Sequence, residues 1–156
     1  MEKLITEEEQ KVLNVFGLFE LTASHTYLHL ANRMKSLSYF GAEKFFLSES
    51  NDEREHYEKI SEFCNDMGSE LSVEQLDAVT STITDIKGAL EMAYQMEKDL
   101  LTAYEEAVTK DLSMKVKIFL YDYVTFQVKA VGEYGDLLAR LALTNDMLLF
   151  DKDLAN

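Results

Sequence analysis

Residues 51–59 read NDEREHYEK and place a glutamate and a histidine three positions apart, at Glu53 and His56. In an α-helix this spacing puts both side chains on one face. The same face is mostly apolar elsewhere, because its members at helical spacing are Tyr39, Ala42, Phe46, Glu49, Glu53, His56, Ile60 and Phe63. The segment therefore predicts a helix whose buried stripe is interrupted near its middle by side chains that can bind a metal ion.

Three other segments show the same kind of interruption in an apolar stripe of helical period. Two of them are broken by a glutamate, at Glu20 and Glu97, and the third is broken by an amide, Gln127. A tyrosine follows each of these two glutamates seven residues later, as Tyr27 and Tyr104. Four helices are thus expected to place ligand-capable side chains at mid-height in one core.

Start and stop signals divide the chain into five helical segments. Thr6 and Glu9 form a capping-box pattern at the first start, and Gly68 is expected to end the second helix. The expected bounds are Thr6 to Lys35, a second helix from after Ser38 to Met67, residues 84–110, Ser113 to Ala142, and Asn145 to Leu154. Residues 69–83 are polar, are expected to be only partly helical, and are too many for a tight turn. This pattern predicts an all-α four-helix bundle with one long crossover and a short fifth helix, in a single domain over 1–156.

The charge composition limits the kinds of partner that this protein can bind. Asp and Glu number 29 against 15 Lys and Arg, so the formal net charge is −14. Such a charge disfavours nucleic acid and anionic membranes and attracts small cations, although solubility alone explains it equally well. There is no apolar run near membrane-spanning length and no signal-peptide pattern in MEKLITEEEQ. Cys64 is the one cysteine, which excludes an intrachain disulfide framework. The expected location is the cytoplasm.

Buried carboxylates need compensation, since burying an unpaired charge is costly. No lysine or arginine lies on the four stripes, but two divalent cations about 3.5–4 Å apart would neutralise the acids. Oxygen-rich ligands with one imidazole favour iron or manganese, and Glu53 can bridge the two ions. Taken singly, a glutamate on such a stripe can be a rim residue and an ExxH pair can arise by chance. Their coincidence on four helices favours the metal site, whereas His25 and His29 are expected at the surface.

Four short motifs carry a resemblance to a known family. NDEREHYEK, MEKDLL at 96–101, QVKA at 127–130 and LFDK at 149–152 stand in the order and at the separations found in haem-free ferritins with H-type chains. The chain resembles these ferritins over nearly its whole length. The resemblance implies a homo-oligomeric shell of 24 subunits, with Met147, Leu148, Leu149 and Phe150 packing at its fourfold axes.

The resemblance also implies residue roles at a di-iron centre without haem. Glu20, Glu53 and His56 would bind the first iron, Glu53 would bridge to the second, Glu97 would bind the second, and Gln127 would be a weak ligand or water anchor. Tyr27 would hydrogen-bond in the site and supply an electron. Asp52, Glu55 and Glu58 match acids that face the cavity and seed mineral, although a solvated helix face is an equally good interpretation.

Departures from the family pattern refine these expectations. Gln127 and Ala130 replace an ExxH pair on the fourth helix, which implies an asymmetric centre. The missing ExxH pair argues against bacterioferritin, and so does the lack of a haem-binding methionine near Glu55. The missing pair also argues against the third inner site of many bacterial ferritins. Lys117 and Leu120 stand where animal chains line a threefold channel with acids, so another iron access route is expected.

The expected function is storage: Fe(II) is oxidised with O2 at the di-iron centre, and Fe(III) mineral is deposited in the cage. Two alternatives stay open. One is a small ferritin-like oxidase or peroxidase that stores nothing, and the other is a non-catalytic shell subunit that only nucleates mineral.

Overall fold

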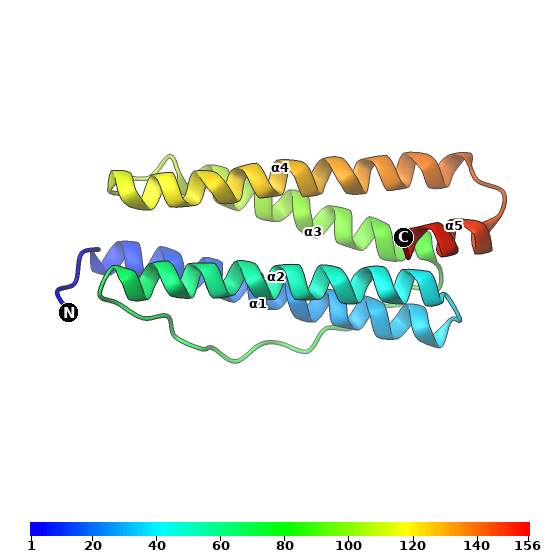
Figure 1. The fold of residues 1–156 in the computed structure, drawn as a ribbon, viewed down its shortest axis with the longest axis horizontal. Helices are drawn as coiled ribbons and strands as arrows, with labels where there is room; N and C mark the ends of the chain where they lie inside the picture. Colours follow the sequence, from blue (N-terminus) through cyan, green and yellow to red (C-terminus); the bar gives the residue numbers. More distant parts are fainter.

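The computed structural model describes residues 1–156 and contains five helices (Figure 1). Their bounds are α1 Glu7–Ser36, α2 Phe40–Asp66, α3 Ile86–Ala107, α4 Met114–Leu143 and α5 Met147–Leu154. Each predicted helix is present near its predicted bounds, which confirms the all-α fold class. None of the five helices combines the length and the apolar character that a membrane crossing requires.

The predicted capping box is present at the start of α1. Thr6 Oγ1 accepts a hydrogen bond of 3.1 Å from the Glu9 amide, and Glu9 Oε1 accepts one of 3.0 Å from the Thr6 amide. The other carboxylate oxygen of Glu9 accepts bonds from the amide and hydroxyl of Ser113, at 2.7 and 2.6 Å. One buried glutamate therefore joins the starts of α1 and α4.

The crossover between α2 and α3 differs from its prediction. Gly68 ends α2 as expected, with a positive φ of 72° that suits glycine, but residues 69–83 contain no helix, so the expectation of partial helicity is wrong. The crossover must run from one end of the bundle to the other (Figure 1). The 30-residue α1 is about 45 Å long at 1.5 Å per residue. Fifteen helical residues would span only about half of that, whereas an extended chain spans it easily.

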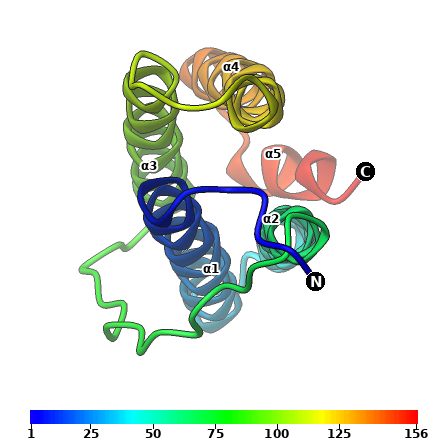
Figure 2. The same cartoon turned by 90° about the vertical axis from the view of Figure 1, so that its left-hand side faces the viewer.

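The four long helices lie at the corners of the bundle, and α5 lies across one end beside α2 (Figure 2). Their apolar side chains form two separate buried clusters, one towards each end. Leu120 is fully buried in the second cluster, so of the two residues matched to the threefold channel only Lys117 reaches the surface. Between the clusters lies a layer of buried polar side chains: Glu20, Glu53, Glu97 and Gln127.

Helix α5 is fixed to the start of α2 through a buried carboxylate. Asp151 accepts hydrogen bonds from the amides of Gly41 and Ala42, at 3.1 and 2.8 Å. A Cβ at Gly41 would lie 1.8 Å from the Asp151 carbonyl oxygen, so only glycine fits. Phe150 is buried and Met147 packs against the same cluster. Phe150 therefore packs within its own chain and not, as expected, between subunits. Leu148 and Leu149 stay exposed, and the packing of α5 against other subunits stays a prediction.

Candidate metal centre

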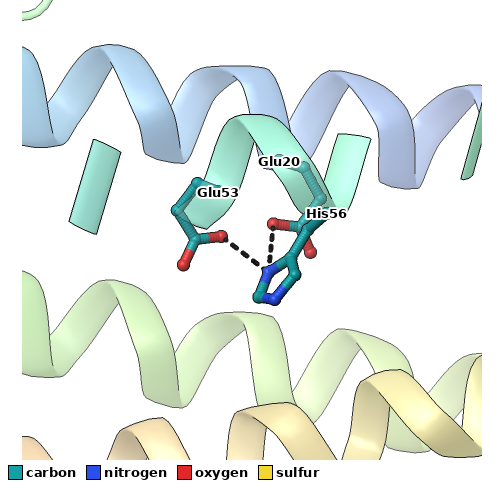
Figure 3. Close-up of side chains that lie close together, drawn as sticks. All are labelled: Glu20, Glu53 and His56. Atoms are coloured by element: carbon teal, nitrogen blue, oxygen red, sulfur yellow. Dashed lines mark ion pairs between the residues drawn. The ribbon is translucent and has the colours of Figure 1, made fainter. Parts of the chain in front are cut away.

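One half of the polar layer is formed by α1 and α2. Glu20 is fully buried, Glu53 is 3% exposed, and the side chain of His56 is 20% exposed. His56 Nδ1 lies 3.6 Å from Glu20 Oε2 and 3.4 Å from Glu53 Oε2 (Figure 3). One ligand atom from each residue lies within 4.8 Å of the other two, which is compact enough for all three to reach one cation.

The three atoms that face each other here lack any hydrogen-bond partner. Glu20 Oε2, Glu53 Oε2 and His56 Nδ1 are all buried and unsatisfied. Leaving such groups unpaired is costly, and the fold nevertheless turns all three towards one point. A hard or borderline divalent cation would satisfy them together, because two carboxylate oxygens and an imidazole nitrogen suit iron or manganese. The residues therefore fit a metal ion.

The other half of the layer is formed by α3 and α4 and is internally satisfied. Glu97 and Gln127 are each 1% exposed. Glu97 Oε1 accepts a hydrogen bond of 2.5 Å from the Tyr27 hydroxyl, and Glu97 Oε2 accepts one of 2.6 Å from Gln127 Nε2. Glu97 does not belong to the three-residue group. The structure thus brings Glu97, Gln127 and Tyr27 together with one another, and the centre is asymmetric.

Two further tyrosines hold the site, and the sequence reasoning gave neither of them a role. Tyr104 donates a 2.5 Å hydrogen bond to Glu20 Oε1, and Tyr123 donates a 2.6 Å bond to the backbone carbonyl of His56. The signal for Tyr104 was present, because it follows Glu97 by the same seven residues that separate Tyr27 from Glu20. No comparable signal marks Tyr123.

The surroundings of Glu20 and Glu53 shift the pKa values of these two carboxyls in opposite directions. Burial opposes ionisation of Glu20, but its interactions with the nearby Glu53 and His56 side chains and with the Tyr104 hydroxyl outweigh it and lower the pKa of Glu20. Burial, together with the neighbouring Glu20 charge, raises the pKa of Glu53 well above its usual value. A proton therefore competes more strongly than usual with a cation for the Glu53 carboxylate.

The site opens to solvent on one side, through a cavity of about 290 Å³ between α2 and α4. We call this cavity the α2/α4 groove. Its lining includes Glu49, Asp52, Glu53 and His56 of α2, together with Phe126 and Glu133 of α4. The Phe126 ring stacks on the His56 imidazole, with centroids 5.1 Å apart and planes 6° apart. Two of the three ligand candidates thus face a path to solvent.

Other candidates from the sequence lie away from the layer. His25 is exposed, and His29 contacts the crossover through a 2.7 Å hydrogen bond to Ser81 Oγ. Asp52, Glu55 and Glu58 are exposed on α2, and their role in seeding mineral stays a prediction.

Four long helices with one long crossover, and a buried layer of carboxylates beside one histidine, define the class of carboxylate-rich four-helix bundles. Within that class, the sequence pattern of the ferritin family, described as a ferritin-like domain, matches residues 10–144. The chain belongs to the ferritin family, as the motifs indicated.

Individual relatives align with this chain over nearly its whole length. A probable bacterial non-haem ferritin-like protein of Haemophilus influenzae is 25% identical, covering 98% of this chain and 97% of its own. A bacterial non-haem ferritin of Staphylococcus haemolyticus is 24% identical, covering 97% and 96%. The crystal structure of an open-pore ferritin from the archaeon Archaeoglobus fulgidus superimposes with a TM-score of 0.90 at 23% identity, covering 97% and 98%. At this identity the structural likeness shows the fold alone.

Proposed function

We propose that this chain is a ferroxidase subunit of an iron-storage ferritin. It binds Fe(II) as substrate in the buried polar layer, oxidises two ions with O2, and delivers Fe(III) to a mineral store enclosed by copies of itself. The observation that carries this proposal is the convergence of three buried, unsatisfied ligand atoms, on Glu20, Glu53 and His56.

The two halves of the layer support different roles for their residues. Glu20, Glu53 and His56 would hold the first ion, because their facing atoms are free. A second ion would lie between Glu53 and Glu97, where Gln127 and Tyr27 already occupy both Glu97 oxygens. Binding there must compete with those two donors or use the remaining lone pairs. The second position is therefore weaker, and this favours release of the product from that side.

The protein's contribution to oxidation is electrostatic. A buried cluster of carboxylates stabilises Fe(III) more than Fe(II), which lowers the potential of the couple. Each of two Fe(II) ions gives one electron, and O2 accepts both together with two protons to leave as hydrogen peroxide. Burial raises the pKa of Glu53, so the first ion would compete with a proton for this carboxylate as it binds.

Replacing Glu53 with alanine tests the proposal. Stopped-flow absorbance after Fe(II) is mixed with oxygenated protein should show loss of the rapid phase, since both ions lose a ligand. Glu62→Ala is the matched control, because Glu62 is an exposed acid of the same helix outside the groove. An unchanged rate in Glu53→Ala would contradict the proposal. Oxygen consumption on Fe(II) addition separates a catalyst from a shell subunit that only nucleates mineral.

Assembly into a 24-subunit shell is part of the same proposal. Large apolar side chains remain exposed on α4 and at the C-terminal end, among them Ile118, Tyr121, Val128, Leu143 and Leu148. Apolar side chains exposed to this extent on a helical surface favour contacts with other subunits. Size-exclusion chromatography distinguishes a shell from the dimer expected of a small non-storing oxidase. The cytoplasmic location expected from the sequence stays a prediction.

A further inference from the structure

An open, mostly apolar groove lies between α1 and α3, on the opposite side of the bundle from the α2/α4 groove (Figure 2). We call it the α1/α3 groove, and its volume is about 580 Å³. Its polar members, Thr22, Gln95 and Asp99, are exposed, and Gln95 donates a 2.9 Å hydrogen bond to Asp99. Its apolar lining consists of Phe19, Ala23, Met92, Met96, Leu100 and Ala103. Unlike the acidic α2/α4 groove, it therefore contains a single charged residue, which is exposed.

The floor of this groove lies at the height of the buried polar layer. Met96 packs against both buried clusters, so it stands between them, as the layer does. On α1, Ala23 is 1% exposed and lies three residues after Glu20. On α3, Leu100 is 6% exposed and lies three residues after Glu97. The groove therefore reaches inward at the level where Glu20 and Glu97 lie.

The side chains at the floor are small or adaptable. Ala23 has only a methyl group and leaves space between α1 and α3. Met96 is unbranched, with three rotatable bonds, and is only partly buried, so it can change its conformation to let a small molecule pass. Neither side chain breaks a strong hydrogen bond when it moves. The boundary between the groove and the polar layer is therefore one that a small apolar molecule can cross.

The chemistry of the lining selects the kind of molecule that enters. A metal ion is disfavoured there, since burying a charge against apolar groups is costly. Apolar cavities instead bind uncharged molecules such as benzene and xenon. O2 is uncharged and apolar, and the proposed reaction consumes it in the polar layer. Of the two substrates of that reaction, the α1/α3 groove therefore suits O2 and excludes Fe(II).

We infer that the α1/α3 groove is a binding site for small apolar molecules, and that O2 reaches the metal centre from this groove, between Ala23 and Met96. The inference rests on the proposed function, because it concerns the second substrate of the same reaction. It places the entry of O2 on the face of the bundle opposite the acidic groove, so a cation bound on the acidic side does not obstruct it.

Crystals of the metal-free protein pressurised with xenon test the binding site, since xenon occupies apolar cavities. The anomalous map of the native protein should show a xenon peak between Ala23 and Met96. Thr22→Phe places an aromatic ring beside the floor and should remove most of this peak. Thr102→Phe is the matched control, because Thr102 is an exposed residue of α3 that does not line the groove, and its peak should equal the native one. A native groove without xenon would overturn the inference.

The dependence of Fe(II) oxidation on O2 concentration provides a functional readout. In Thr22→Phe the initial rate at low O2 should fall several-fold, whereas the rate at saturating O2 and the dependence on Fe(II) concentration should stay native. Thr102→Phe should match the native protein at every O2 concentration. A native rate of Thr22→Phe at low O2, or a loss confined to its Fe(II) dependence, would refute O2 entry by this groove. If the native protein binds xenon but oxidises no Fe(II) at any O2 concentration, the proposed function fails instead.

Discussion

Tyr104 on α3 donates a hydrogen bond of 2.5 Å to Glu20 on α1, and the bond from Tyr27 on α1 to Glu97 on α3 has the same length. On each helix the glutamate and the tyrosine are seven residues, or about 10.5 Å, apart. Helices α1 and α3 run in opposite directions (Figure 1). The two Glu–Tyr pairs therefore meet crosswise, and each glutamate is held by the tyrosine of the other helix.

Removing the Tyr104 hydroxyl should destabilise the metal-free protein. In Tyr104→Phe the buried Glu20 loses a donor that lowers its pKa, and an unsatisfied buried acceptor costs about 1–3 kcal/mol. Thermal unfolding of the metal-free variant at neutral pH measures the loss. Tyr121→Phe is the control, since Tyr121 is 52% exposed and should tolerate the change. Equal melting temperatures for native protein and Tyr104→Phe would show that the bond contributes nothing.

Glu53→Gln should separate stability from function. The folded protein raises the pKa of Glu53, so between the ordinary value of 4.5 and the raised value it binds more protons than the unfolded chain. Stability therefore falls as pH rises through that window. Glutamine removes this dependence, so metal-free Glu53→Gln should exceed the native protein in stability by a margin that grows with pH. The same variant should lose rapid Fe(II) oxidation. Unfolding curves of both proteins at pH 5 and pH 8 measure this stability difference. A difference that shrinks as pH rises would contradict the prediction.

The sequence predicted the polar layer because each of its members interrupts an apolar stripe. Glu20, Glu53, Glu97 and Gln127 are all buried as the stripes require, while their roles as ligands stay predictions. The apolar neighbours of Glu97 on α3 are not fixed by the spacing alone. Ala93 and Leu100 are buried, whereas Tyr94 and Leu101 are only partly buried. A helix of 3.6 residues per turn permits a step of either three or four from Glu97, and only packing selects between them.

Contacts between residues of different helices could not be predicted from the sequence. The pairing of Tyr104 with Glu20 depends on how far α3 is shifted along α1, which no local pattern specifies. The same holds for Asp151, whose carboxylate reaches the start of α2 across 110 residues of sequence. The crossover was misjudged for a related reason, since its extended form follows from the length of the bundle.

The asymmetry of the centre predicts unequal effects of two substitutions. His56→Ala removes one of three free ligand atoms from the first position, so rapid oxidation should fall by at least about 100-fold. Gln127→Ala removes a donor to Glu97 and should cost only about ten-fold or less. Stopped-flow oxidation of both variants under identical conditions gives the order. A larger effect for Gln127→Ala would reverse our assignment of the stronger half.

The raised pKa of Glu49 gives a second pH signature. The pKa of Glu49 is about 7 in the folded protein and 4.5 in the unfolded chain. Between these values the unfolded chain loses its proton while the folded protein keeps it, so stability falls as pH rises. Stability lost between pH 4.5 and 7 should amount to roughly 2 kcal/mol, after allowance for the partial exposure of Glu49. Glu49→Gln should recover most of it at pH 8 and little at pH 4.5. Denaturation of the metal-free protein at both values checks the sign. Equal gains at both would assign the effect to packing instead of charge.

Asp151 should control the attachment of α5. Helix α2 has no side-chain cap of its own at Tyr39, and Asp151 supplies acceptors to its first amides from another element. Loss of a helix N-cap typically costs about 1 kcal/mol, and Asp151→Ala also loosens the packing of Phe150 in the core. The variant should therefore melt at a lower temperature and expose amides of α5 to hydrogen exchange.

Asp153→Ala is the matched control, because Asp153 is an exposed acid of the same helix whose contact with Arg140, at 4.0 Å, is weak. In the proposed shell, Leu148 and Leu149 would contact other subunits only while α5 is docked, so Asp151→Ala should also shift size-exclusion profiles towards smaller species. Unchanged exchange in α5 would mean that apolar packing holds the helix without its carboxylate.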